Sequence, residues 1–172
     1  MRRFLVLVLC LLPAALPAYN VEDWEEPGGM SFSVQGNPDG GRYGISFEDA
    51  TWLAKTPVIG QFFLNAMRHG DIDSSFGGIG MIFRVMPHWR VAPYIGAGAS
   101  YNQLLNGNSE TSESTPEDER VGSTWAGHAE GGVRIGLPGL FHFLEIYGRQ
   151  TWSEVEAVGD YWTAGFGYGT NW

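Results

Sequence analysis

Apolar and polar side chains alternate with a period of two over most of the chain beyond residue 28. The clearest run covers 75–86, where one face carries Ile79, Met81, Phe83 and Val85 and the other carries glycines, Ile82 and Arg84. The alternation returns in 90–102, 123–136, 140–149 and 162–172. Successive side chains of a β-strand point to opposite faces, so the pattern predicts strands with one apolar and one polar face.

The same alternation, weaker in the first half of the chain, extends the prediction to eight strands. The turn signal Asn-Pro-Asp-Gly-Gly at 37–41 separates the first two. Residues 58–68 also fit a short amphipathic helix, and we prefer the strand. The predicted strands are 29–36, 42–53, 58–68, 74–86, 89–103, 122–136, 140–152 and 160–172.

Strand and connection lengths indicate the environment of these strands. Most runs are long enough for a tilted strand to cross a bilayer, which takes about 9–11 residues, whereas strands of soluble proteins average roughly five or six. Short connections at 87–89 and 137–139 contrast with a long one at 104–121. This layout predicts an all-β protein, an eight-stranded antiparallel up-and-down transmembrane β-barrel with the termini and short turns in the periplasm.

The N-terminal segment has the layout of a secretory signal peptide. Arg2 and Arg3 precede an apolar run, and small residues follow up to Ala18. The run is too short to cross a bilayer as a helix. A lipoprotein signal at Cys10 is disfavoured because Leu9 precedes it. We therefore predict a signal peptide at 1–18, a periplasmic lead-in at 19–28 and an outer-membrane barrel at 29–172.

Composition narrows the function classes. The chain has 10 Lys+Arg against 19 Asp+Glu, a net charge of −9. Removing residues 1–18 lowers the net charge to −11 and takes away the one cysteine. An acidic chain without basic clusters is not expected to bind nucleic acid, and a cysteine-free chain cannot form disulfides.

Tryptophans provide a second indication of the membrane. Aromatic rings gather at the two interfaces of membrane barrels. The predicted topology places six tryptophans at strand ends: Trp52, Trp89 and Trp172 at the periplasmic ends, and Trp125, Trp152 and Trp162 toward the outer ends.

The segment 90–102, Arg-Val-Ala-Pro-Tyr-Ile-Gly-Ala-Gly-Ala-Ser-Tyr-Asn, resembles the PYxGxGxGY strand of small outer-membrane barrels of the outer-membrane protein A and opacity types. Residues 126–137 resemble the glycine-rich strand that follows it. The C-terminal 164–172 is similar to the assembly signal of such barrels, although Thr170 departs from it. The resemblance implies a monomer in the cell outer membrane of a Gram-negative cell, in contact with lipid and lipopolysaccharide, with Trp172 read by the barrel-assembly machinery.

Charged residues on the polar strand faces are the candidate site. The interior of an eight-stranded barrel is just wide enough for side chains to fill, and buried charges need partners. We therefore predict a lumen closed by an ion-pair network, with a narrow pore or a catalytic site as alternatives. The predicted members are Arg84, Arg90, Glu130, Arg134, Glu145 and Arg149.

Catalysis is the main functional alternative. Lipid A deacylases among small barrels carry a His-x-Ser pair, but His128 is followed by Ala129 and Glu130, so the nucleophile is missing at that spacing. The remaining weak candidate for a catalytic site consists of Ser100, His128, Glu130 and Glu145. We predict no enzyme and no cofactor. The four histidines lack metal-ligand spacing, so we also predict no metal.

The predicted function is a structural or surface-interaction role in the outer membrane. The alternatives are a lipid A-modifying barrel enzyme and a soluble ligand-binding barrel. The acidic loop 106–120 is predicted to be a solvated cap, with contact to surface sugars as its alternative role.

Overall fold

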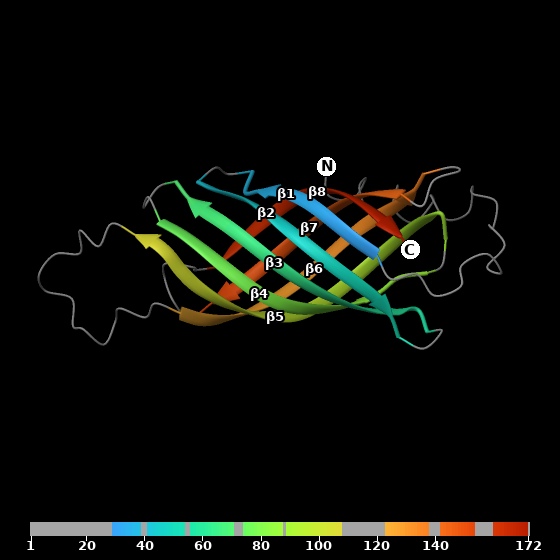
Figure 1. The fold of residues 1–172 in the computed structure, drawn as a ribbon, viewed down its shortest axis with the longest axis horizontal. Coiled ribbons are helices and arrows are strands. Elements are labelled where there is room, and N and C mark those ends of the chain that lie inside the picture. The colour runs from blue at the N-terminus through green and yellow to red at the C-terminus, as the bar shows by residue number, and fades with distance from the viewer. Residues whose placement is uncertain are drawn as a thin grey trace, which may run out of the picture.

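The computed structural model describes residues 29–38, 41–53, 56–70, 74–87, 89–107, 123–137, 142–153 and 160–171. The described residues form eight strands that pair antiparallel with their sequence neighbours, and β1 also pairs with β8, closing a barrel (Figure 1). This confirms the predicted fold. The strands are β1 (Gly29–Gly36), β2 (Arg42–Trp52), β3 (Val58–His69), β4 (Ser74–Val85), β5 (Val91–Gly107), β6 (Ser123–Gly136), β7 (His142–Ser153) and β8 (Tyr161–Asn171).

The strand predicted at 58–68 is confirmed, because residues 58–69 pair with β2 and β4 along their length, and the helical alternative is wrong. The ends of other strands differ from the prediction, and β5 shows the largest difference. β5 runs four residues beyond its predicted end at 103, because Asn106 and Gly107 still pair with β4. A register shift between Ser75 and Phe76 of β4 accommodates the extra residue in β5.

Alternating strand directions define two ends of the barrel. The terminal end contains Gly29 and Asn171, and the loop end contains Gly107 and Ser123, which flank the long connection. Within the described residues, the structure contains no helix long and apolar enough to cross a membrane.

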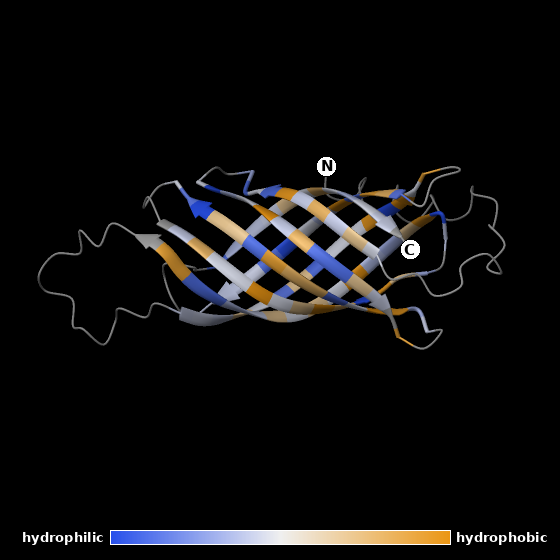
Figure 2. Ribbon diagram, viewed as in Figure 1, coloured by the Kyte–Doolittle hydropathy of each residue, from blue (hydrophilic) through white to orange (hydrophobic). Residues whose placement is uncertain are grey.

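Large apolar side chains cover the outside of the barrel. Phe83, Ile95 and Phe166 are 50%, 70% and 48% exposed, and hydrophobic positions alternate with hydrophilic ones along the strands (Figure 2). We call this surface the outer belt. Its large exposed members within the strands are Met30, Phe32, Val34, Tyr43, Ile45, Phe47, Phe62, Leu64, Ile79, Met81, Phe83, Val85, Ile95, Tyr101, Leu105, Trp125, Ile146, Trp152, Trp162, Phe166 and Tyr168.

Side chains fill the lumen in layers. Ala50, Ile59, Met86 and Ala92 belong to an apolar cluster toward the terminal end, together with Tyr94 and Tyr147. A second apolar cluster lies toward the loop end and consists of Met67, Phe76 and Tyr161. Polar and charged side chains occupy the space between the clusters.

Gly165 shows how glycine makes this filling possible. A Cβ at Gly165 would overlap the ring of Tyr147. Without it, the Tyr147 side chain passes over β8, and its hydroxyl lies 2.9 Å from Ser33 Oγ of β1. The glycine-rich inward faces therefore admit long side chains from other strands.

Candidate functional site

Six buried charged residues form the centre of the lumen, and we call them the ionic layer. They come from four strands: Glu48 on β2, Arg84 on β4, Glu130 and Arg134 on β6, and Glu145 and Arg149 on β7. Each is at most 7% exposed. Three arginines face three glutamates, so the layer is neutral when all six are ionised.

Arg84 connects three carboxylates from three strands. Its Nε donates to Glu130, its Nη1 lies 3.1 Å from Glu145 Oε1, and its Nη2 lies 3.7 Å from Glu48 Oε2. Arg84 has no exposed surface. Its guanidinium therefore joins the two sides of the barrel across the lumen.

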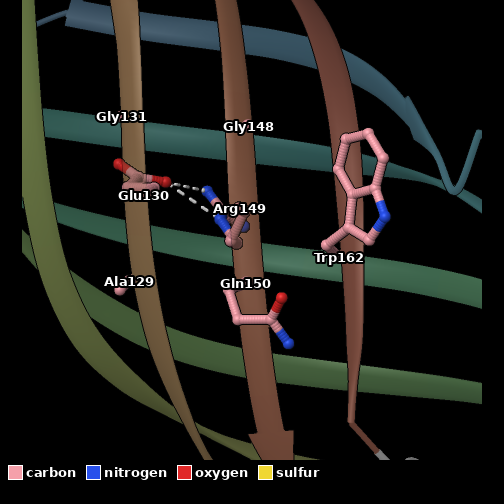
Figure 3. A pocket seen from close by; sticks show the side chains of 7 residues that line it. All are labelled: Ala129, Glu130, Gly131, Gly148, Arg149, Gln150 and Trp162. Atoms are coloured by element: carbon pink, nitrogen blue, oxygen red, sulfur yellow. Dashed lines mark hydrogen bonds and ion pairs between the residues drawn. The ribbon is translucent and has the colours of Figure 1, made fainter. Parts of the chain in front are cut away.

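The remaining arginines complete the network. Arg149 Nη2 lies 2.8 Å from Glu130 Oε2 and 3.2 Å from Glu48 Oε1. The pair between Glu130 and Arg149 is visible in Figure 3. Arg134 Nε and Nη2 both lie 3.0 Å from Glu145 Oε2. Every carboxylate of the layer thus contacts two arginines, which is the compensation that buried charge requires.

Strand register places these pairs. Glu130 is the Cα partner of Arg149, and Arg134 is the partner of Glu145, on the inner face of the β6–β7 ladder. Opposite charges directly across an antiparallel ladder stabilise it. Gly96 is the partner of Arg84 on β5, and a Cβ there would lie 3.0 Å from Arg84 Cγ. Glycine at 96 therefore leaves room for the arginine.

Aromatic rings cover the guanidinium groups. The Cζ atoms of Arg84, Arg134 and Arg149 lie 4.4, 4.0 and 4.9 Å from the ring centroids of Tyr94, Phe143 and Phe63, respectively. Contacts of this kind are more favourable when water is excluded.

Neutral donors complete the shell of the carboxylates. The Tyr94 hydroxyl donates to Glu145 Oε1 at 2.8 Å. Gln61 Nε2 donates to Glu48, and the hydroxyls of Ser31 and Ser46 donate to the same carboxylate at 3.3 and 3.4 Å. Polar side chains from further strands thus hold the ionic layer in place.

The structure brings together five of the six residues predicted for the network. The prediction is wrong for Arg90, which is exposed in the turn before β5, where its Nε donates to the Gly136 carbonyl at 3.2 Å. The alternation of side chains predicts which residues face the lumen only where the chain is paired as a strand. Because β5 begins at Val91, Arg90 lies before the paired region. Sequence reasoning missed Glu48, although Ser46, Glu48 and Ala50 alternate with the outer-belt residues of β2.

A second polar group lies next to Phe63. Ser100 Oγ lies 2.7 Å from His128 Nε2, and His128 Nδ1 lies 3.0 Å from Thr151 Oγ1. Asn102 Nδ2 donates to Ser100 Oγ at 2.9 Å. The Ser–His contact resembles an activated nucleophile, but the group next to the histidine is a threonine, and Ser100 has no exposed surface. The arrangement satisfies buried polar groups and gives a substrate no access.

The four tryptophans whose side chains are described lie at the two ends of the outside surface. Trp125, Trp152 and Trp162 are exposed near the loop end, and Trp89 is exposed in a turn at the terminal end. The side chain of Trp52 and all of Trp172 lie outside the described residues, as do residues 1–28 and 108–122. Among the described residues, no group of three or more His, Cys, Asp or Glu side chains could hold a metal ion.

Comparison with known proteins shows a likeness in fold. The chain matches no protein-family model and no curated protein sequence. Among solved structures it is similar to the N-terminal β-barrel domain of Pseudomonas aeruginosa OprF, with a TM-score of 0.57 and 14% identity over 86% of this chain and 100% of that one. It is also similar to Neisserial surface protein A (NspA), with a TM-score of 0.53 and 15% identity over 85% and 94% of the two chains. These likenesses and the closed barrel define the class of fold, the small eight-stranded outer-membrane-type β-barrel.

Proposed function

We propose that the chain is an integral outer-membrane β-barrel protein with a structural or surface-interaction role, its lumen closed by the ionic layer. The observation that carries this proposal is the inverted distribution of side chains. Large apolar residues cover the outside, while Arg84, Glu145 and Arg149 are buried inside. In water such a surface would be a large exposed apolar patch, whereas in hydrocarbon it is the favourable face.

The same distribution disfavours a soluble ligand-binding barrel. A ligand site in a barrel mouth is expected to be a concave, mostly apolar cavity, but this lumen is filled by side chains, including Phe63, Arg84 and Ile82, each with no exposed surface. The outside of a soluble barrel would also be polar. Both departures favour the membrane proposal.

Two further observations and two predictions from the sequence support an outer-membrane location. The strands other than β1 have 11 to 17 residues, enough to cross a bilayer when tilted. The similar solved structures are an OprF barrel domain and a surface protein. The predicted signal peptide at 1–18 and the terminal Trp172 fit export and recognition by the assembly machinery.

The buried Ser100–His128 contact favours a structural role over lipid A hydrolysis. Both residues face the lumen, whereas a lipid substrate would approach from the outer belt. We therefore propose a protein without enzymatic activity, whose described lumen serves stability. We also propose that it is a monomer and that the acidic segment 108–120, which follows β5, serves as a solvated cap.

Expression of the full chain in a Gram-negative host tests the proposal. We expect the protein in the outer-membrane fraction, resistant to carbonate extraction, with gel mobility that changes on heating. Recovery as a soluble periplasmic protein would overturn the membrane assignment. Release of fatty acid from lipopolysaccharide by the purified wild type, lost in Ser100→Ala, would overturn the non-enzymatic role.

A further inference from the structure

A hollow interrupts the outer belt over β6, β7 and β8. Strand register arranges its residues in rows that cross the three strands. Gly131, Gly148 and Ala164 form a row of small side chains, and the next row toward the terminal end consists of the larger Val133, Ile146 and Phe166. The row toward the loop end consists of Ala129, Gln150 and Trp162. Gly131 and Gly148 form the floor of a hollow of about 420 Å³, Ala129, Gln150 and Trp162 line its edge toward the loop end, and Glu130 and Arg149 also line it (Figure 3).

Packing inside the barrel does not require the two glycines of the floor. A Cβ at Gly148 would meet only the Thr163 carbonyl oxygen, at 3.9 Å, and a Cβ at Gly131 would meet the Tyr94 carbonyl oxygen at 3.6 Å. Both are ordinary contacts. At the inward Gly98, by contrast, a Cβ would overlap the backbone of β4. Glycine weakens a strand, and within strands it often marks the close approach of a ligand. The ligand in this case would approach from outside.

The rim carries a carboxamide. Gln150 is half-buried on the outer face, between Ala129 and Trp162 (Figure 3). Its Nε2 donates to the Thr151 carbonyl oxygen at 3.2 Å. A primary amide has two donor hydrogens and an accepting oxygen, so Gln150 keeps capacity for a further partner. An amide on a lipid-facing surface is costly without such a partner.

We propose that this hollow holds one hydroxylated acyl chain of lipid A from the outer leaflet, with the Gln150 amide bonded to the hydroxyl of that chain. The inference rests on the proposed membrane location. The hollow is continuous with the outer belt, whose neighbour in a membrane is lipid. Its floor lies at mid-barrel, beside the ionic layer, and its edge at Gln150 and Trp162 lies toward the loop end, on the same side as Trp125 and Trp152, where the outer leaflet is expected.

Its shape favours a lipid chain over a second copy of the protein. A two-fold contact would place the same patch of each copy against the other. Two facing hollows would leave a gap between their floors, and the rims at Ile146 and Trp162 would meet first. A flexible acyl chain can follow the floor instead.

A second hollow in the outer belt provides the contrast. It measures about 500 Å³ and is lined by Phe62, Met81, Phe83, Ala99 and Tyr101, among others. No carboxamide lines it, so it offers an acyl chain contact without an amide partner. Selectivity for a hydroxylated chain is therefore assigned to the hollow at Gln150.

Native mass spectrometry of the detergent-purified protein tests this assignment, with hexa-acylated lipid A and phosphatidylethanolamine as probes. We expect the wild type to retain one lipid A in preference to phosphatidylethanolamine. Gly148→Leu fills the floor and should lower lipid A retention by about tenfold or more. Gln150→Leu removes one hydrogen bond and should lower it by roughly fivefold while leaving phosphatidylethanolamine unchanged. Ala66→Leu, which adds one carbon fewer at an exposed position of β3, should match the wild type.

Heat-dependent gel mobility verifies that each variant is folded, and Gln150→Leu keeps the test valid should Gly148→Leu not fold. Lipid A retention within about twofold of wild type in both hollow variants would overturn the inference. So would an equal loss in Ala66→Leu, or a wild-type dimer that Gly148→Leu abolishes. A wild type that inserts in the membrane but retains no lipid A would overturn this inference and leave the proposed function standing.

Discussion

Glu130 occupies the point where two arginines of the lumen meet. It accepts hydrogen bonds from Arg84 and Arg149, and it is 7% exposed. Removing its charge leaves two buried guanidinium groups with one carboxylate fewer to share. Uncompensated buried charge is among the most destabilising changes known in proteins.

We expect Glu130→Gln to lower the free energy of unfolding by about 3–5 kcal/mol. The measurement is urea unfolding of the folded barrel in detergent, followed by heat-dependent gel mobility. Arg90→Gln is the control, because Arg90 is exposed outside the network, and it should change stability by less than about 0.5 kcal/mol. Equal effects of the two substitutions would contradict the role of the ionic layer.

The glycines provide a second contrast between the inside and the outside. A Cβ at Gly98 would overlap the Met81 carbonyl and the Ile82 backbone, whereas a Cβ at Gly127 would meet nothing within 4 Å. Gly98→Ala is expected to destabilise by about 1–3 kcal/mol or to prevent folding, because the backbone must move. Gly127→Ala should be neutral or stabilise by up to about 1 kcal/mol. The measurement is the urea midpoint of each variant. A Gly98→Ala variant as stable as wild type would show that the β4 backbone can shift at low energetic cost to accommodate the added Cβ.

Individual residues of the site were predictable where two conditions held together. A charged residue had to lie within a regular strand, and its alternation had to be clear. Arg84, Arg134 and Glu145 met both conditions. Arg90 failed the first, because the ladder begins after it. Glu48 failed the second, because it lies in the part of the sequence where the apolar face is interrupted by Asp49. Which carboxylate each arginine contacts depends on closure of the barrel, and a sequence does not specify that distance.

At the level of strands, β3 shows why one element stayed ambiguous. Phe62, Phe63 and Leu64 are consecutive apolar residues. Phe62 and Leu64 belong to the outer belt, while Phe63 fills the lumen with no exposed surface. Because both faces carry apolar side chains, periodicity alone cannot separate a strand from a helix at this position. The pairing of this segment with β2 and β4 shows that it is a strand.

The outer belt should tolerate charge only near its edges. We expect Met81→Arg, within β4, to cost roughly 2–4 kcal/mol in lipid, and Leu105→Arg, near the loop end of β5, to cost roughly 0–1 kcal/mol. Both wild-type side chains are exposed, at 47% and 63%. Folding yield into phosphatidylcholine vesicles measures the difference. Equal yields would contradict a bilayer that covers Met81.

The connection between β5 and β6 should be dispensable for assembly. The two strands pair from Val91 with Ile135 up to Gln103 with Ser123, before the connection begins. Deleting 108–119 should leave outer-membrane assembly and the heat-dependent mobility shift intact, since loop length has a small effect on closure entropy. Loss of the folded form in the deletion variant, with wild type assembled in parallel, would contradict this.

At the scale of the whole barrel, the filled lumen predicts that ions do not pass. Apolar clusters lie on both sides of the ionic layer. Purified protein in a planar bilayer is therefore expected to show no steady conductance, whereas a wide porin inserted under the same conditions provides the positive control. A stable ohmic current from the eight-stranded barrel would show that the layers open.

The global architecture was the most predictable level. Alternation, strand length and short turns each depend on local sequence, and together they indicated the closed eight-stranded barrel. The sequence does not show which charged residues pair across the lumen, because those contacts join residues as distant along the chain as Glu48 and Arg149.

Arg84 and Glu48 come from the first half of the chain, and their ionic partners Glu130, Glu145 and Arg149 come from the second. In the proposed membrane setting, an unclosed sheet would keep Arg84 and Glu48 away from their partners on β6 and β7, and buried charge would face hydrocarbon at a large solvation cost. The polarity of the interior would thus penalise a half-built intermediate in the bilayer, and insertion is expected to become more favourable as β1 pairs with β8. The ionic layer that is proposed to close the lumen would then also tie entry into lipid to the completion of the cylinder.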